Sequence, residues 1–210
     1  MSALDNFRRY FAECPLVAII RGVTPADAEA TARAIFDGRI RIIEVPLNSP
    51  QPFESIRIIA DAIGDRALIG AGTVLDTGDV RQVQQAGGRL IVAPNMDRDV
   101  ISAAIDAGMV TSPGFFTPTE AFAAIEAGAH ALKLFPAEAA SPAVLRAMKA
   151  VLPKGFPLIV VGGVGIDNVS GWLDCGADGF GLGSGLYNPG QEAAETLARA
   201  SAFVAAVRRR

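Results

Sequence analysis

Residues 40–73 read IRIIEVPLNSPQPFESIRIIADAIGDRALIGAGT, and this stretch contains the pattern that decides the fold. An apolar run, Ile40–Val45, is followed by a helix-like segment, Pro50–Ile63. Gly64 ends that segment, and a second apolar run, Ala67–Thr73, comes shortly after it. A strand, a helix and a further strand in this order form the repeating unit of parallel α/β folds.

The same unit repeats from one end of the chain to the other. Short apolar runs alternate with helix-like segments, and the runs are eight in number: Leu16–Arg21, Ile40–Val45, Ala67–Thr73, Leu90–Pro94, Met109–Pro113, Ala131–Phe135, Leu158–Gly163 and Gly179–Ser184. The helix-like segments include Pro25–Asp37, Pro50–Ile63, Asp97–Ala107 and Thr119–Ala127. Strands that are continuous apolar runs indicate a parallel sheet buried on both faces.

Glycines and threonines mark the ends and beginnings of the predicted helices. A glycine just past a helix supplies a left-handed cap without a Cβ clash, and seven glycines are placed in this way: Gly38, Gly64, Gly87, Gly108, Gly128, Gly155 and Gly176. The segments Thr24-Pro25-Ala26-Asp27 and Thr117-Pro118-Thr119-Glu120 each place threonine at the N-cap, proline at the first helical position and an acid at the third.

Eight strand–helix units of about 25 residues account for nearly all of the 210 residues. A closed (β/α)₈ barrel, the TIM barrel, fits this pattern best, and we expect one α/β domain over residues 1–210. Ser2–Glu13 predicts an extra N-terminal helix, within residues 1–14. A doubly wound open sheet is the alternative, but such sheets usually carry fewer strands.

Composition excludes several classes of function. A net charge of −3 and a pI of about 5.2 disfavour nucleic acid as a partner. The single histidine, His130, excludes a metal site built on several histidines, and we expect it to be structural. Cys14 and Cys175 are too few for a disulfide framework or a cysteine-rich zinc site. No segment has the pattern of a signal peptide or a membrane span, so we expect a soluble, cytoplasmic protein.

Lys133 is the strongest candidate for a catalytic residue. It lies within the apolar segment Ala131–Pro136, and strand alternation places Ala131 and Phe135 on its face. Burial lowers the pKa of a lysine and frees its amine to act as a nucleophile. A lysine that extends to solvent or pairs with an acid is the alternative. Phe135 is expected to form a wall of the substrate pocket.

Glu44 is the candidate partner of this lysine. It follows Ile40 and Ile42 on one face of its predicted strand, so we expect its carboxylate to project to the same side as those isoleucines. A buried carboxylate near a lysine forms an ion pair, transfers protons, or does both. A purely structural ion pair with a basic residue such as Arg21 is the alternative.

Two glycine clusters follow the last two predicted strands. They are Val160-Val161-Gly162-Gly163-Val164 and Gly181-Leu182-Gly183-Ser184-Gly185. Phosphate often binds between the corresponding loops of such barrels, where backbone N–H groups can approach it. The two clusters together predict a phosphate site, to which the Ser184 hydroxyl would add a hydrogen bond. Tight turns alone would also explain each cluster.

Several of these segments resemble the 2-keto-3-deoxy-6-phosphogluconate / 6-phosphogalactonate aldolase family, and the similarity covers essentially the whole chain. They are Ile42-Ile43-Glu44-Val45, Ile69-Gly70-Ala71-Gly72-Thr73-Val74, Ala131-Leu132-Lys133-Leu134-Phe135-Pro136 and Val161-Gly162-Gly163-Val164. Members of this family are class I aldolases that fold as (β/α)₈ barrels and assemble as trimers. The resemblance therefore implies a homotrimer that acts on a small phosphorylated keto acid without a metal or cofactor.

The resemblance also implies a role for each site residue. Lys133 would form the Schiff base and Glu44 would be the general acid and base. Arg21 and Thr73 would hold the carboxylate end of pyruvate. The phosphate would lie at Gly162, Gly163, Gly183 and Ser184.

Two branches of this family differ in the configuration of the substrate at C4. Glu44–Pro50 and Ile19–Gly22 are similar to the galactonate branch. Phe135–Glu138 is similar to the gluconate branch, and Gly165 stands where galactonate enzymes usually carry threonine. The resemblance implies cleavage of 2-dehydro-3-deoxy-6-phospho-D-galactonate to pyruvate and D-glyceraldehyde 3-phosphate, with the gluconate epimer as the alternative substrate.

Two further functions are compatible with the same barrel, since a fold does not determine its reaction. One is a phosphosugar isomerase or a different Schiff-base lyase. The other is a catalytically silent barrel that serves as an oligomeric binding module.

Overall fold

The computed structural model describes residues 2–208, and their strands form one parallel sheet. The strand order is β5-β4-β3-β2-β1-β9-β8-β7-β6. The strands are β1 (Leu16–Ile19), β2 (Ile42–Pro46), β3 (Leu68–Gly72), β4 (Leu90–Val92), β5 (Val110–Ser112), β6 (Gly114–Phe115), β7 (Leu132–Leu134), β8 (Leu158–Val161) and β9 (Gly179–Leu182). The predicted α/β barrel is confirmed, and the open doubly wound sheet is excluded by the closure described below.

The predicted fifth strand, Met109–Pro113, is divided into β5 and β6 on either side of Pro113. β5 pairs with β4, whereas β6 pairs with β7. The Lys133 N–H donates to the Pro113 carbonyl at 2.9 Å, and the His130 N–H donates to the Thr111 carbonyl at 3.0 Å. Residues 110–115 are thus hydrogen-bonded to β4 on one side and to β7 on the other, which closes the barrel. Pro113 has no N–H to donate, but its carbonyl accepts a hydrogen bond.

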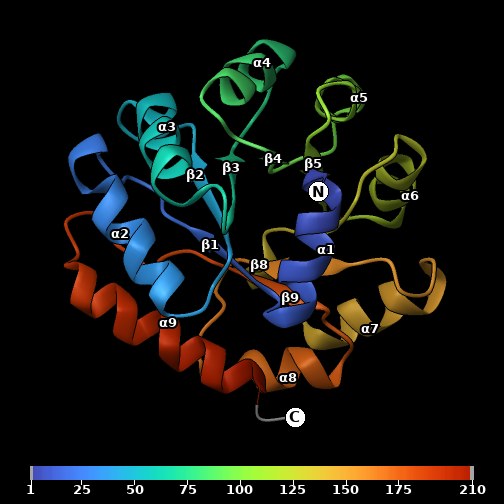
Figure 1. The fold of residues 1–210 in the computed structure, drawn as a ribbon. Helices are drawn as coiled ribbons and strands as arrows, with labels where there is room; N and C mark the ends of the chain where they lie inside the picture. Colours follow the sequence, from blue (N-terminus) through green and yellow to red (C-terminus); the bar gives the residue numbers. More distant parts are fainter. Residues whose placement is uncertain (1, 209–210) are drawn as a thin grey trace.

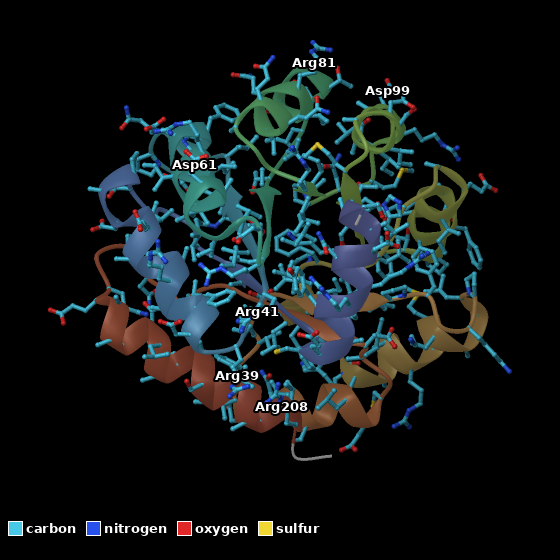
Figure 2. All side chains as sticks on the ribbon, in the orientation of Figure 1. Arg39, Arg41, Asp61, Arg81, Asp99 and Arg208 are labelled. Atoms are coloured by element: carbon cyan, nitrogen blue, oxygen red, sulfur yellow. The ribbon has the colours of Figure 1, made fainter. Side chains whose placement is uncertain are left out.

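Helices surround the barrel, and α1 crosses one of its ends (Figure 1). They are α1 (Ala3–Glu13), α2 (Pro25–Asp37), α3 (Pro52–Ile63), α4 (Thr77–Gln85), α5 (Arg98–Asp106), α6 (Pro118–Glu126), α7 (Pro142–Val151), α8 (Val169–Asp174) and α9 (Ala193–Arg208), with a short 3₁₀ helix η1 (Ala137–Ala139). The extra N-terminal helix is therefore confirmed. Charged side chains such as Asp61, Arg81 and Asp99 project outward from this ring (Figure 2).

The start signals of the helices are confirmed, but two of the glycine stops are not left-handed. Thr24 and Thr117 are the N-caps of α2 and α6. Gly38 and Gly64 have φ of −69° and −66°, so the prediction of a left-handed cap is wrong at both. After α2 the left-handed residue is Arg39, with φ of 71°.

The apolar residues divide into two cores, one inside the barrel and one between the strands and the helices. Val17, Ile42 and Ala131 belong to the inner core, together with Phe7 and Tyr10 of α1. Leu132 and Leu134 belong to the outer core, as strand alternation predicts. Ile40 also belongs to the outer core, so its predicted place on the face of Ile42 and Glu44 is wrong. It precedes β2 directly after the left-handed Arg39, where strand alternation does not yet apply.

Among the described residues, no helix is both long enough and apolar enough to cross a membrane.

Candidate active site

Lys133 is the central residue of β7, and its side chain is buried inside the barrel. The residue is only 6% exposed, and Ala131 on the same face lies in the inner core. Burial lowers the pKa of Lys133, the Glu44 carboxylate opposes that effect, and the positive charge of Arg21 adds to it. The amine is thus closer to its neutral, nucleophilic form than an exposed lysine would be.

Glu44 is the central residue of β2 and is 1% exposed. Burial raises its pKa to about 7, although the positive charges of Lys133 and Arg21 oppose the rise. Its Oε2 atom has no hydrogen-bond partner among the described residues. The carboxylate lies against Gly72 at the end of β3, since a Cβ atom there would come within 2.0 Å of Oε2. A general acid and base works best with a pKa near the pH of the reaction, so a pKa of about 7 suits Glu44 to proton transfer near neutral pH.

An interior pocket contains both side chains. Most of its lining is apolar, and its polar members are Glu44, Lys133 and Ser112. Ser112 is not among the site residues predicted from the sequence, because the run Met109–Pro113 has the pattern of an ordinary buried strand. The signal was present, since Ser112 has the same strand parity as Val110, which belongs to the inner core.

A second cavity, the mouth cavity, has a volume of about 160 Å³ and lies at the carboxyl ends of the strands. Lys133 lines both this cavity and the interior pocket. The lining brings together most residues that the sequence suggested: Arg21, Lys133, Phe135, Gly162, Gly163, Gly183 and Ser184. The Lys133 Nζ atom lies 4.8 Å from the centre of the Phe135 ring, so this ring does border the lysine.

Arg21 and Thr73 follow the ends of β1 and β3. Arg21 is exposed, and its Nη1 donates to the Oδ1 atom of Asn48, a partner that sequence reasoning missed. Thr73 is half-buried and has a φ of 58°, a left-handed conformation that is rare for a β-branched residue. It lines neither the interior pocket nor the mouth cavity. Thr73 directly follows Gly72, so its left-handed conformation lies next to the glycine that contacts the Glu44 carboxylate.

Glu138 in η1 is a further residue of the mouth cavity that was not predicted as part of the site. A Cβ atom at Gly162 would lie 2.1 Å from its Oε2, and one at Gly163 would lie 2.7 Å from its Cγ. Both glycines also have positive φ, 112° and 61°. Glycine is therefore required at both positions by backbone conformation and by the approach of the Glu138 side chain.

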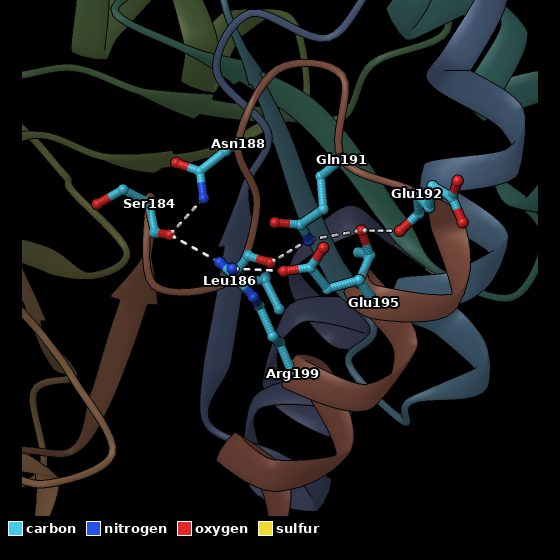
Figure 3. A network of polar contacts seen from close by, with 8 residues as sticks. Ser184, Leu186, Asn188, Gln191, Glu192, Glu195 and Arg199 are labelled. Atoms are coloured by element: carbon cyan, nitrogen blue, oxygen red, sulfur yellow. Dashed lines mark hydrogen bonds and ion pairs between the residues drawn. The ribbon is translucent and has the colours of Figure 1, made fainter.

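The loop after β9 is held by polar contacts with the start of α9 (Figure 3). The Ser184 carbonyl accepts hydrogen bonds from Asn188 Nδ2 at 3.1 Å and Arg199 Nη1 at 3.2 Å. Arg199 is itself paired with Glu195 at 2.6 Å. These contacts are made to the backbone of the loop and leave the Ser184 side chain free of them. That side chain is exposed and lines the mouth cavity.

His130 lies away from this chemistry. It is half-buried, and its Nδ1 accepts a hydrogen bond from the Thr111 N–H at 3.1 Å. Within residues 2–208, no three His, Cys, Asp or Glu side chains are grouped closely enough to hold a metal ion.

Comparison with known proteins agrees with this geometry. The model of the family described as KDPG and KHG aldolase matches residues 8–201. The chain belongs to the KDPG and KHG aldolase family. This confirms the resemblance seen in the sequence.

Three relatives place the chain more closely within the family. It is 50% identical to a 2-dehydro-3-deoxy-6-phosphogalactonate aldolase of Escherichia coli K12, over 92% of this chain and 95% of the relative. It is 47% identical to a probable 2-dehydro-3-deoxy-6-phosphogalactonate aldolase of Rhizobium meliloti 1021, over 92% of each chain. A solved structure described as native KDPGal superimposes with a TM-score of 0.92 at 49% identity, covering 93% of this chain and 95% of the other.

Proposed function

We propose that this protein is a class I aldolase that cleaves 2-dehydro-3-deoxy-6-phospho-D-galactonate to pyruvate and D-glyceraldehyde 3-phosphate. The observation that carries the proposal is the burial of Lys133 beside Glu44, with the pKa of Lys133 lowered and that of Glu44 raised to about 7. Two relatives named for this activity, at 50% and 47% identity, support the choice of substrate.

The reaction begins when the neutral amine of Lys133 attacks the C2 ketone. Glu44, acting through a water molecule, relays protons while the carbinolamine forms and loses water. The resulting iminium accepts the electron pair of the C3–C4 bond as that bond breaks, and Glu44 takes the proton of the C4 hydroxyl. D-Glyceraldehyde 3-phosphate leaves, and the remaining enamine is protonated at C3 and hydrolysed to pyruvate. The sequence of steps requires neither a metal nor a cofactor.

The remaining site residues bind the two ends of the substrate. Arg21 and Thr73 hold the carboxylate. Arg21 lines the mouth cavity, whereas Thr73 lies outside its lining and directly follows Gly72, which contacts the Glu44 carboxylate. The phosphate lies at the glycine turns after β8 and β9, at Gly162, Gly163, Gly183 and Ser184, which line the same cavity. Backbone N–H groups at glycine turns are well suited to a phosphate.

Borohydride reduction in the presence of pyruvate tests the chemistry directly. We expect mass spectrometry to find a stable pyruvate-derived adduct on Lys133, and no adduct in Lys133→Met. An unmodified wild-type enzyme would refute the Schiff-base mechanism. Isomerase activity that survives Lys133→Ala would support the alternative phosphosugar isomerase.

The gluconate epimer remains the second candidate substrate, because Phe135–Glu138 and Gly165 depart from the galactonate pattern. In the structure Gly165 has a local role, since its N–H donates to Asn168 Oδ1 at 3.0 Å and a Cβ would lie 2.5 Å from Asp167 Oδ1. We expect kcat/KM to be higher for the galactonate epimer. A clear preference for the gluconate epimer would reverse the assignment.

The assembly proposed is a homotrimer in the cytoplasm. Phe116 and Phe122 support an oligomer, because these large apolar residues are 39% and 42% exposed in the isolated chain. Sedimentation equilibrium of the purified protein measures the assembly, and a monomer mass would contradict it.

A further inference from the structure

The lining of the interior pocket contains two polar atoms that no described residue satisfies. They are Glu44 Oε2 and Ser112 Oγ, and both residues are almost fully buried, at 1% and 3% exposed. Except for Lys133, the other lining residues offer no polar side chain: Phe7, Val17, Ile19, Leu90, Val92, Ile159, Val161 and Gly181. Buried polar groups in folded proteins are nearly always hydrogen-bonded, so two such atoms in one pocket need an explanation.

The size of the pocket supplies that explanation. Its cavity measures about 10 Å³, which is close to the least space that holds one water molecule. A buried water also needs two to four polar partners. Glu44, Ser112 and Lys133 are the three polar side chains that line the pocket.

We propose that Ser112 is a positioning residue that holds one buried water against the Glu44 carboxylate, in the pocket that Lys133 also lines. The proposal rests on the aldolase function proposed above and deepens it. Ser112 does not touch the substrate in this arrangement. It acts through the water on Glu44.

A hydroxyl group suits this position for a chemical reason. It can both donate and accept a hydrogen bond, so it can hold the water whether Glu44 is ionised or protonated. When Glu44 is ionised, the water donates to its carboxylate and favours the charged form, against the effect of burial. Glu44 alternates between the two forms during the reaction, so its partner must tolerate both.

A crystal structure tests the water site without any measurement of activity. In the wild-type enzyme we expect an ordered water within hydrogen-bond distance of both Ser112 Oγ and the Glu44 carboxylate. In Ser112→Ala we expect that water to be lost or weakly occupied. A well-ordered wild-type pocket that holds no water, or a water bound equally in Ser112→Ala, would overturn the proposal.

The pH profile of the reaction tests the effect on Glu44. In Ser112→Ala we expect kcat to fall about fivefold, the worth of one net hydrogen bond, with KM nearly unchanged. The apparent pKa on the acid side of the kcat profile should rise, because the ionised carboxylate loses the support of the water. The charged groups that act on Glu44, Lys133 and Arg21, are unchanged in this variant.

Ser55→Ala is the matched control. Ser55 is also a fully buried serine whose Oγ has no partner among the described residues, but it lies in α3 and does not line the pocket. We expect its profile to match the wild type. Superimposable profiles for Ser112→Ala and the wild type, or equal shifts in Ser55→Ala, would overturn the role of Ser112. If the wild type lacked aldolase activity, the proposed function would fail while the crystal structures still decided the water site.

Discussion

At the scale of single residues, the site depends on two ionisable groups whose pKa values are moved toward each other. Burial lowers the pKa of Lys133 and raises that of Glu44 to about 7. Glu44 then changes protonation at modest cost near neutral pH, and the amine of Lys133 is closer to its neutral form than that of an exposed lysine. An amine nucleophile with an adjacent acid and base requires both shifts. The low-dielectric barrel interior, and not either residue type alone, produces both shifts.

Gly72→Ala should disable Glu44 without unfolding the protein. The new Cβ would come within 2.0 Å of Glu44 Oε2, so the carboxylate must move. We expect kcat to fall by at least about tenfold, since misplacement of a general acid and base removes most of its contribution. Gly171→Ala in α8 is the control, because a Cβ there meets nothing within 4 Å. Equal kcat values in the two variants would contradict the prediction.

Glu44→Gln should change how stability depends on pH. The pKa of Glu44 rises from an ordinary 4.5 to about 7 on folding. The folded state therefore holds a proton that the unfolded state releases, so this contribution to stability is complete below pH 4.5 and is lost as pH rises through 7. The loss amounts to about 3 kcal/mol.

Denaturant unfolding at several pH values measures this effect. Relative to the wild type, Glu44→Gln should gain stability between pH 4.5 and 7 because glutamine does not titrate. Glu126→Gln provides a control on the surface, where the side chain is 72% exposed. A constant difference between Glu44→Gln and the wild type across this range would be inconsistent with the raised pKa.

At the scale of elements, the first residues of α2 and α6 differ in how they cap the helix, although both begin at a threonine followed by a proline. α6 begins with a complete capping box, in which the Thr117 Oγ1 accepts from the Glu120 N–H and the Glu120 carboxylate accepts from the Thr117 N–H at 2.8 Å. α2 also begins at a threonine and a proline, yet its Thr24 makes no side-chain bond to the backbone of the helix. The two starts share a sequence pattern but differ in geometry.

Thr117→Ala should therefore cost more stability than Thr24→Ala. The loss of a cap bond typically costs about 1 kcal/mol, and only Thr117 makes that bond. Thr24 donates instead to the Asp27 side chain at 2.7 Å, an exposed contact of smaller worth. Urea unfolding of both variants compares the losses, and equal values would show that the geometry of the cap does not matter here.

At the scale of the whole molecule, α1 crosses one end of the barrel (Figure 1). Phe7 is 2% exposed and lines the pocket that also contains Lys133 and Glu44. The desolvation that shifts the pKa values of both catalytic candidates thus depends on a helix outside the eight repeating units.

Phe7→Ala should reduce stability and also weaken the shift at Lys133. Loss of a buried phenylalanine costs about 3–5 kcal/mol, and water entering the pocket would raise the lysine pKa toward its ordinary value. The pH dependence of borohydride trapping with pyruvate would then move to higher pH. Phe11→Ala is the control, because Phe11 stacks on Phe7 with ring centres 5.3 Å apart but does not line the pocket. It should lose stability without moving the profile.

Much of this architecture could be predicted from local pattern. Apolar runs and helix-like segments repeat with regular spacing, so the strands, most helix ends and the inward direction of Lys133 follow from strand and helix periodicity. Strand alternation fails at Ile40, because this residue precedes β2 and follows the left-handed Arg39. Periodicity holds only within an element, and its ends are set by backbone conformation.

The sequence by itself determined the alternation of strands and helices, the apolar strand around Lys133 and the glycine turns, because each depends on residues close together in the chain. Only the tertiary structure decided that Ser112 joins Lys133 and Glu44 in one pocket, that Glu138 lies against Gly162, and that Phe7 lines that pocket. These contacts join residues far apart in the chain, and their geometry depends on how the strands are arranged around the closed barrel. Local periodicity gives the face on which a side chain lies, whereas closure of the barrel decides which other side chains it meets there.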